Sequence, residues 1–287
     1  MNKAELYAKN NYLPKRDAIL CLEEYASKIK WKRSSNRILD IGCGDGSVTT
    51  ILKKFIPTDY KLLGCDISDI MVNYANNHHF NEQTSFTVLD IEGDLPEGMK
   101  GNFDHVFSFY TLHWIINQER AFNNIYNLLN EDGECFMMFL AWAPVFAVYR
   151  ALSRNNKWSA LLKDAERYIS PYHDSQEPEK EISKMLEKVG FIDCDVECKD
   201  LVYVYDDIRV MRELLISVSP FNIPKEMQDD FMEDYLEVLK EMEIVDKNNN
   251  NYDASVSYPY RLLVVHARKP TKDIILDGLN FESTAQE

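Results

Sequence analysis

A glycine-rich turn between a short apolar run and a helical stretch is the feature that most restricts the fold of this chain. The run Arg37–Ile41 leads into the turn Asp40–Gly46, which reads DIGCGDG, and apolar residues at helical spacing follow from Val48 to Phe55. Glycines at every second position let a backbone turn tightly and come close to a ligand. We therefore expect a strand, a turn and a helix here. Exposed N–H groups of the turn and the helix N-terminus would face a carboxylate or a phosphate.

Similar apolar runs and helical stretches alternate through the first half of the chain. Further strands are predicted at residues 61–66, 85–90, 103–109 and 134–140, and helices at 70–77 and 119–129. Ser68 is the expected N-cap of the first of these helices. Short strands separated by helices predict right-handed crossovers and a mostly parallel sheet with helices on both faces, which is an α/β fold.

The pattern changes after residue 140. Residues 142–172 are aromatic and irregular, helices are predicted at 177–189, 208–218 and 225–245, and strands at 192–205 and 260–268. We predict one domain over residues 1–270. Its core covers about 30–140, 190–205 and 257–268, and a helical substrate cap covers about 1–25, 141–190 and 206–256. Residues 271–287 are expected to form a disordered polar tail.

The charge of the chain argues against two classes of partner. Lys and Arg number 32 and Asp and Glu number 47, a net charge of −15. A chain this acidic repels phosphate backbones and anionic lipids, so we expect neither nucleic acid nor a membrane surface as partner. The longest apolar run, Cys135–Tyr149, is interrupted by Pro144 and is too short for a membrane span.

Cysteine and histidine usage predicts neither disulfides nor a metal. No secretory signal opens the sequence, so the six cysteines are expected to be reduced thiols in a cytoplasmic protein. Cys194 and Cys198 have no second pair at ligand spacing, and the six histidines do not cluster with acids.

Three acids at three successive strand ends predict the cofactor. Asp40 lies beside the glycine turn, and a carboxylate there suits a cation such as the α-ammonium group of S-adenosylmethionine. Asp66 lies where a ribose diol needs an acceptor, and Asp90, with Ile91 lining the ring, where an adenine amino group needs one. A dinucleotide fingerprint requires glycine at position 47, which is Ser47.

This set resembles the class I S-adenosylmethionine-dependent methyltransferases. The resemblance implies a Rossmann-like, mostly parallel seven-stranded sheet. It also implies a cofactor-binding set of Asp40, Gly42, Cys43, Gly44, Asp45, Asp66, Ile67, Asp90, Ile91 and Ser108.

A closer resemblance, to the insect juvenile hormone acid O-methyltransferase family, extends over nearly the whole chain. The segments that carry it are Lys15–Ala18, Asp40–Thr49, Asp90–Asp94, Phe103–Trp114, Ile169–His173 and Pro220–Pro224. It implies formation of the methyl ester of farnesoic acid or juvenile hormone acid, with S-adenosylmethionine and without a metal. Ser108–Trp114 is also similar to a segment of plant carboxyl methyltransferases, in which the Trp holds the substrate carboxylate.

The residues fit that chemistry independently. A carboxylic acid has a pKa of about 4 to 5, so at neutral pH it is already a nucleophile and needs no general base. Trp114 offers one indole N–H to a carboxylate oxygen, and His113 and Tyr110 are neighbouring candidates for the catalytic site. For each of the three, core packing at a strand end is the alternative.

The aromatic residues beyond position 140 are expected to bind the apolar chain of an isoprenoid or fatty acid, since burial of apolar surface is favourable. The alternative is that they form the core of the cap. With Trp114, the predicted substrate-binding set is Trp142, Phe146, Tyr149, Tyr168, Tyr172 and Phe221, and Trp158 belongs to the same group.

The chain departs from the family at position 14, where the family usually carries a glutamine that shares the carboxylate with the Trp. Pro14 has neither an amide nor a backbone N–H. An alternative is therefore a paralogue that binds the cofactor and a lipophilic acid with weak or no esterification. A third possibility is an N- or C-methyltransferase with His113 as general base. Chain length, epoxidation state and oligomeric state are left open.

Overall fold

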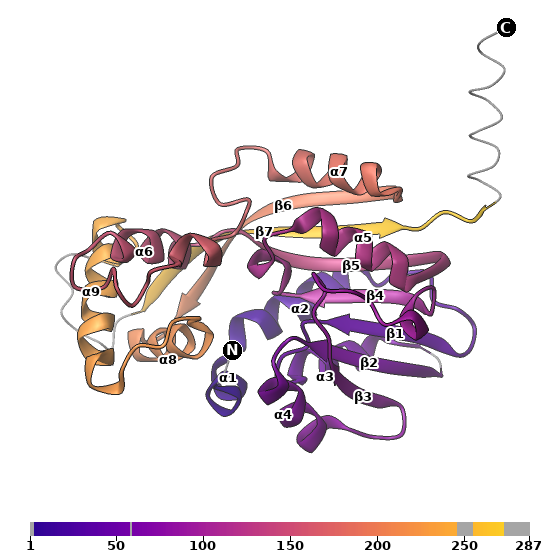
Figure 1. The fold of residues 1–287 in the computed structure, drawn as a ribbon, viewed down its shortest axis with the longest axis horizontal. Coiled ribbons are helices and arrows are strands. Elements are labelled where there is room, and N and C mark those ends of the chain that lie inside the picture. The colour runs from indigo at the N-terminus through magenta and orange to yellow at the C-terminus, as the bar shows by residue number, and fades with distance from the viewer. Residues whose placement is uncertain (1–2, 58, 246–254, 273–287) are drawn as a thin grey trace, which may run out of the picture.

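A seven-stranded sheet organises the chain, and the computed structural model describes residues 3–57, 59–245 and 255–272 (Figure 1). The strand order is β3-β2-β1-β4-β5-β7-β6. The pairs from β3 to β5 are parallel, whereas β7 runs antiparallel to both of its neighbours. The strands are β1 (Asn36–Ile41), β2 (Tyr60–Asp66), β3 (Thr84–Val88), β4 (Phe103–Phe109), β5 (Leu129–Trp142), β6 (Ile192–Tyr205) and β7 (Val256–Arg268).

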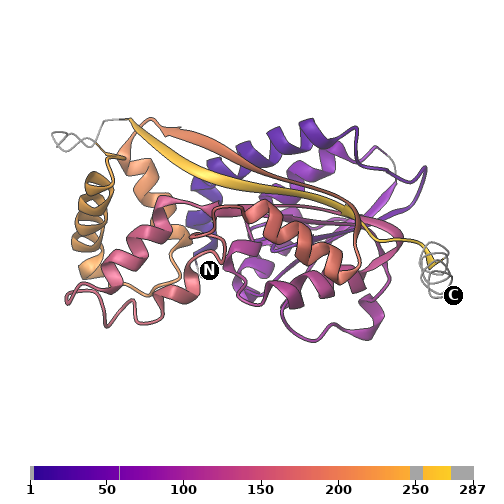
Figure 2. The same cartoon turned by 90° about the horizontal axis from the view of Figure 1, so that it is seen from above.

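Helices cover both faces of this sheet and gather at one end of it (Figures 1 and 2). The α-helices are α1 (Ala4–Asn10), α2 (Tyr12–Tyr25), α3 (Ser47–Leu52), α4 (Asp69–His79), α5 (Gln118–Leu128), α6 (Pro144–Ser153), α7 (Pro178–Val189), α8 (Ile208–Val218) and α9 (Gln228–Glu241). The last two and α6 lie together beyond the end of the central strands, where β6 and β7 extend to meet them (Figure 2). The predicted mostly parallel, Rossmann-like α/β fold is confirmed.

The period of two along each strand divides the core between the two faces. Phe107 of β4 packs in one cluster with α2 and α3, whereas its neighbour Val106 packs in a second cluster with α5 and α7. Strands buried on both faces read as continuous apolar runs, which is why they stand out in the sequence.

Local signals set several helix ends as predicted. The Ser68 side chain accepts a hydrogen bond from the Met71 N–H at 3.3 Å and caps α4. Pro178 begins α7, and Gly190 ends it in the left-handed conformation at φ 109°. Proline at the first helical position and glycine after the last are the expected arrangement.

Some elements differ from the prediction. Helices α1, α2 and α6 were not predicted, although α6 begins at Pro144, a residue suited to the first position of a helix. The helix predicted over 225–245 is a 3₁₀ turn, Lys225–Met227, followed by α9. Strand β5 begins at Leu129, five residues before the predicted start at 134, and an irregularity with Asp132 at φ 61° lies within it.

The fold leaves two predictions untested, wholly or in part. The division into core and cap remains a prediction, and the predicted tail lies outside the described residues apart from positions 271 and 272. Among the described residues, no helix has the length and apolar character needed to cross a bilayer.

Candidate active site

A cavity of about 360 Å³ opens at the carboxyl ends of the first four strands. This is the place where open α/β sheets bind ligands. Its walls come from the turn after β1, from Asp66 and Ile67 after β2, from residues 89–92 after β3 and from residues 109–115 after β4. Tyr7 of α1 and Pro14 of α2 lie across from the strand ends.

The glycine turn is compact, and most of its backbone N–H groups already donate hydrogen bonds within the protein. Gly42, Gly44 and Gly46 all have positive φ, and a Cβ at Gly42 would lie 2.0 Å from Thr111 Oγ1. The expectation of a row of exposed N–H donors is wrong for most of the turn. The N–H groups of Gly42 and Cys43 donate to the Cys65 carbonyl at 2.7 and 2.9 Å, since β2 runs directly beside the turn.

Asp40 is a buried carboxyl at the end of β1. Its side chain is 1% exposed, and Oδ2 accepts a hydrogen bond from Thr49 Oγ1 at 2.5 Å. Burial raises the pKa of Asp40 to about 7, against the lowering effect of the Thr49 hydrogen bond. A positively charged ligand beside this group would restore its ionised form.

Asp66, at the end of β2, is held in position by two backbone donors. Its oxygens accept hydrogen bonds from the Gly44 N–H at 3.0 Å and the Ser68 N–H at 2.8 Å. Burial raises the pKa of Asp66, and the two hydrogen bonds oppose that shift. The glycine turn and the second strand end are therefore joined through this carboxyl.

The rest of the cavity rim combines acids with aliphatic side chains. Asp90 is exposed and accepts from the Glu92 N–H at 2.9 Å, while Ile91 is buried beneath it. Ile67 is an aliphatic side chain left 67% exposed at the rim, a position that suits contact with a flat ring.

The charges around the cavity are strongly asymmetric. Five carboxyl groups line it, whereas Arg167 is the one cationic side chain among its described lining residues. Asp45, one of the acids, is buried and accepts hydrogen bonds from Asn11 and Ser47. A cavity with this balance fits a cationic ligand better than an anionic one. The acids lining it are Asp40, Asp45, Asp66, Asp90 and Glu92.

Of the predicted cofactor set, Ser108 alone lies outside the cavity lining. Its buried hydroxyl donates to the Ile41 carbonyl at 3.0 Å and ties β4 to β1. The remaining nine residues of the set line the cavity together.

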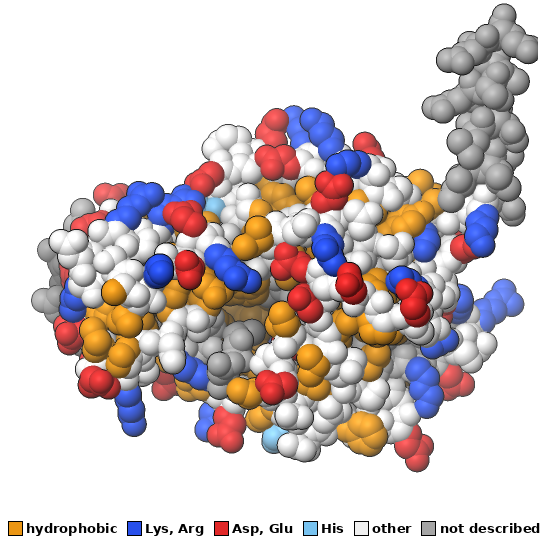
Figure 3. Space-filling model, in the orientation of Figure 1, with side chains coloured by type: hydrophobic (Ala, Val, Ile, Leu, Met, Phe, Trp, Pro, Cys, Tyr) orange, Lys and Arg blue, Asp and Glu red, His pale blue; other side chains and the backbone are white. Residues whose placement is uncertain are grey.

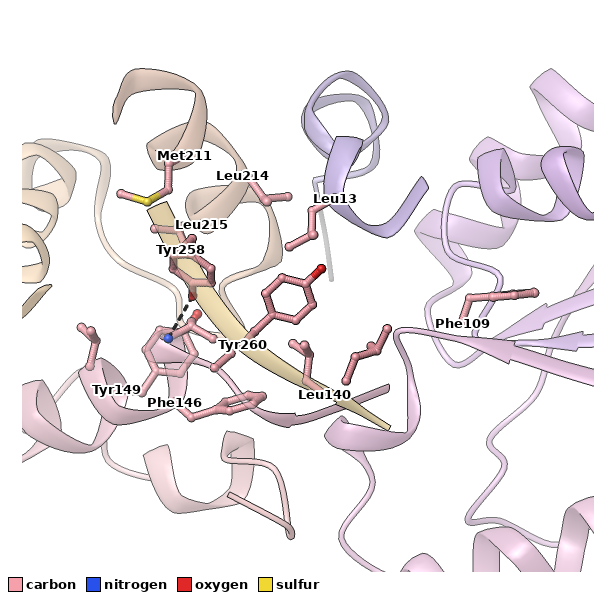
Figure 4. Packing of buried hydrophobic residues seen from close by; sticks show 14 of the residues in the cluster. Leu13, Phe109, Leu140, Phe146, Tyr149, Met211, Leu214, Leu215, Tyr258 and Tyr260 are labelled. Atoms are coloured by element: carbon pink, nitrogen blue, oxygen red, sulfur yellow. Dashed lines mark hydrogen bonds between the residues drawn. The ribbon is translucent and has the colours of Figure 1, made fainter. Parts of the chain in front are cut away.

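A smaller apolar chamber of about 70 Å³ adjoins the cavity. The two spaces share five wall residues: Tyr7, Pro14, Tyr110, Trp114 and Val218. In Figure 4 the chamber residues Leu13, Leu140, Phe146, Leu214 and Tyr260 approach one another from α2, β5, α6, α8 and β7. Hydrophobic side chains also border a hollow near the middle of the face in Figure 3.

The three predicted catalytic residues meet at the boundary of these two spaces. Trp114 lines both, and its ring lies 4.8 Å from that of His113, which lines the chamber. Tyr110 has φ 54°, an uncommon conformation for a non-glycine residue, and its hydroxyl donates to Asp17 at 2.6 Å. The hydroxyl proton of Tyr110 is thus already committed within the protein.

His113 is neutral in this environment. Burial lowers the pKa of His113 to about 3, and Nδ1 accepts a hydrogen bond from the Leu140 N–H at 3.3 Å. A neutral imidazole that accepts at Nδ1 carries its proton on Nε2.

The predicted aromatic set is divided by the fold. Phe146 lines the chamber and Tyr168 lines the larger cavity. The others lie outside both spaces: Trp142 is stacked with His173, Tyr149 meets Phe221 edge to face at 5.0 Å, Tyr172 hydrogen-bonds Gln118, and Trp158 donates to Asp234.

Sequence reasoning did not assign roles to Asp17, Tyr260, Arg16 and Tyr7, which all lie at this site. Asp17, 1% exposed, accepts hydrogen bonds from Tyr110, Tyr260 and its neighbour Arg16, and Tyr7 lines both spaces. Asp17 lies in the segment Lys15–Ala18, and the family resemblance of that segment is the one signal that could have pointed to it.

Comparisons with known proteins agree with this geometry. Residues 39–137 match the family model described as a methyltransferase domain. The chain is 55% identical to juvenile hormone acid O-methyltransferase of Bombyx mori, over 94% of this chain and 98% of the relative. It is 39% identical to the Drosophila melanogaster protein of the same name, over 98% of this chain and the full length of that protein.

A solved structure shares the fold at low sequence identity. Phosphoethanolamine N-methyltransferase 2 of Haemonchus contortus, in complex with S-adenosyl-L-methionine, superposes with a TM-score of 0.54 and 17% identity. The match covers 89% of this chain and 53% of that chain. The resemblance stated from the sequence is confirmed: this chain belongs to the juvenile hormone acid O-methyltransferase family, and it is an S-adenosylmethionine-dependent methyltransferase.

Proposed function

We propose that this chain transfers a methyl group from S-adenosylmethionine to the carboxylate of a lipophilic acid: farnesoic acid, juvenile hormone acid or a fatty acid. One observation carries the proposal. An acid-lined cavity, suited to a cation, adjoins an apolar chamber across a wall that contains Trp114. Membership of the family, with its juvenile hormone acid O-methyltransferases, supports the same substrate class.

The residues around the cavity fit the cofactor. A buried Asp40 with a pKa raised to about 7 gains from a nearby ammonium group. Asp66, held by Gly44 and Ser68, offers its oxygens to the ribose, and Asp90 with Ile67 and Ile91 surrounds the adenine. The proposed cofactor set is Asp40, Gly42, Cys43, Gly44, Asp45, Asp66, Ile67, Asp90 and Ile91.

The reaction requires no proton transfer from the substrate. When bound, S-adenosylmethionine supplies a methyl group on a sulfonium sulfur, and this group passes to a carboxylate oxygen with loss of both charges. An acid with a pKa of about 4 to 5 is already ionised, so the protein supplies alignment and exclusion of water. The N–H of Trp114 holds one oxygen at the shared wall.

The state of His113 argues against the N- or C-methyltransferase alternative. A general base there needs a free lone pair and a pKa near neutrality. The Leu140 N–H occupies Nδ1, and burial lowers the pKa of His113 to about 3.

The size of the chamber limits the acid that this conformation admits. A volume of about 70 Å³ is far smaller than the about 360 Å³ of the adjoining cavity. A long isoprenoid chain must therefore displace part of the wall, and Val218 of α8 and Tyr7 of α1 stand where the cavity and the chamber meet.

Methyl-ester formation from farnesoic acid, juvenile hormone acid and medium-chain fatty acids tests the proposal. We expect turnover of at least one of these with S-adenosylmethionine and no added metal. Absence of turnover for all of them, in protein that binds S-adenosylhomocysteine, would reject this substrate class.

Pro14 favours a second candidate, a paralogue that binds lipophilic acids and esterifies them weakly. The residue lines both spaces and offers no donor there. Pro14→Gln distinguishes the candidates: a gain in kcat/KM of tenfold or more indicates a missing donor, and no gain indicates that other groups already hold the carboxylate.

The proposal keeps a small lipophilic acid as the partner and no nucleic acid, in line with the acidic character of the chain. A cytoplasmic location remains part of it, and fractionation of cell extracts tests that location.

A further inference from the structure

We infer that the Nε2–H group of His113 is the second donor to the substrate carboxylate, beside the indole N–H of Trp114. This inference rests on the proposed function. It names the group that holds the carboxylate oxygen to which Pro14 cannot donate. It assigns His113 to binding an ionised acid rather than to acid–base chemistry.

The chemical state of the ring supplies the first step. Because Nδ1 accepts from the Leu140 N–H and burial keeps the ring neutral, the single ring proton is on Nε2. His113 is 2% exposed, and no hydrogen bond joins its Nε2 to another residue that the structure describes. Because His113 lines the chamber, a ligand in the chamber can accept a hydrogen bond from this donor.

The position of the ring supplies the second step. His113 lines the apolar chamber, and its centroid lies 4.8 Å from that of Trp114. A carboxylate has two oxygens and accepts several hydrogen bonds, so two adjacent neutral donors can each hold one oxygen. Neutral donors orient a carboxylate without a fixed cation, which leaves the methyl donor as its counter-charge.

Three other polar groups that line the chamber, those of Tyr110, Tyr260 and Tyr7, are less suited to this task. Tyr110 and Tyr260 both donate their hydroxyl protons to Asp17, at 2.6 and 2.7 Å. Tyr7 also lines the acid-lined cavity, where the carboxyls of Asp45 and Asp66 contribute with burial to raising the pKa of its phenol. A carboxylate near those acids would be repelled.

The test compares the acid with an uncharged ligand of the same chain. In the presence of saturating S-adenosylhomocysteine, His113→Phe is expected to weaken farnesoic acid binding ten- to a hundredfold and farnesol binding by less than threefold. His113→Gln, which keeps a donor, should recover most of the acid affinity. The matched control is His78→Phe, because His78 is an exposed histidine on α4 that does not line the chamber.

Three results would overturn the inference. The first is unchanged acid affinity in His113→Phe, in a protein whose wild type esterifies the acid. The second is an equal loss of acid and alcohol binding, which indicates a packing role. The third is wild-type protein that binds S-adenosylhomocysteine but neither ligand, and this result would overturn the proposed function as well. With S-adenosylmethionine saturating at every pH, a profile of kcat/KM for the acid that is flat from about pH 6 to 8.5 is expected for a neutral donor.

Discussion

The hydroxyl of Tyr110, at the end of β4, donates a hydrogen bond to the carboxylate of Asp17 in α2, with 2.6 Å between the oxygens. The two residues are 93 positions apart in sequence, and Asp17 is 1% exposed. The same carboxylate accepts from the hydroxyl of Tyr260 at 2.7 Å and pairs with Arg16 at 2.8 Å. This network fixes the wall between the cofactor cavity and the apolar chamber.

Removal of the carboxylate should destabilise the protein more than removal of one of its donors. Asp17→Ala leaves Arg16 and two hydroxyls without their acceptor, and we expect a loss of about 3 to 5 kcal/mol in the free energy of unfolding. Tyr110→Phe removes one hydrogen bond to a charged group and should cost about 1.5 to 3 kcal/mol. Urea denaturation measures both, with the exposed Tyr12→Phe as control.

The committed hydroxyl of Tyr110 also predicts a kinetic result. In Tyr110→Phe, kcat/KM for the acid should fall only a few-fold, because the lost donor served Asp17 and not the substrate. A loss of a hundredfold or more in a variant that remains folded would show that this hydroxyl acts directly on the substrate.

Trp114 and Trp142 form a matched pair for testing the proposed carboxylate site. Trp114 lies at the shared wall, whereas Trp142 is stacked with His173 outside both spaces. Trp114→Phe removes an N–H donor and should lower kcat/KM for the acid by about ten- to a hundredfold. Trp142→Phe should leave kcat/KM within about threefold. Similar losses in the two variants would contradict the assignment.

Asp40 predicts a pH dependence of cofactor binding. Its pKa is raised from 3.8 to about 7 by burial, so its contribution to folding stability is greatest below about pH 4 and is lost as the pH rises to about 7. A cationic ligand favours the ionised form, so affinity should rise about tenfold between about pH 6 and 8, with release of a proton. Calorimetry in buffers of different ionisation enthalpy measures that proton.

The variant Asp40→Asn separates this effect from general pH sensitivity. It should bind the cofactor more weakly and with a flat pH profile over the same range. The exposed Asp59→Asn should keep the wild-type profile. A wild-type slope that persists in Asp40→Asn would assign the titration to another group.

Because the chamber is small, a substitution in its wall should change which lengths of acid the protein prefers as substrates. Leu214 of α8 is a buried chamber residue. Leu214→Ala should raise the ratio of kcat/KM for long acids to that for short ones, while lowering the free energy of unfolding by about 2 to 4 kcal/mol. An assay over a series of acids of different length measures the ratio. An unchanged ratio would show that the apolar part of the substrate binds outside this chamber.

The central strands and the cofactor end of the site could be predicted from local sequence. A strand buried on both faces is a continuous apolar run, and the turn after β1 requires glycines wherever φ is positive. Asp40 and Asp66 lie at the ends of β1 and β2 and Asp90 lies just after β3, so the topology alone brings them to one edge. These patterns extend over only a few residues, which is why they are readable without tertiary structure.

The substrate end could be predicted only in part. The sequence does not distinguish a large aromatic side chain that lines a chamber, such as Phe146, from one that only packs in a core, such as Trp158 or Tyr172. Asp17 acquires its partners from β7 and from the end of β4, and no local pattern records that pairing. Ser108 lies at a strand end but turns toward the neighbouring strand.

The most direct measurement is a calorimetric titration of S-adenosylhomocysteine into the folded wild-type protein and into Asp66→Ala. The account predicts saturable one-to-one binding to the wild type. It predicts a loss of affinity of about ten- to a hundredfold in the variant, because Asp66 joins the glycine turn to the end of β2. No heat of binding to folded wild-type protein, or equal affinities of the two proteins, would contradict the claim that the acid-lined cavity holds the cofactor.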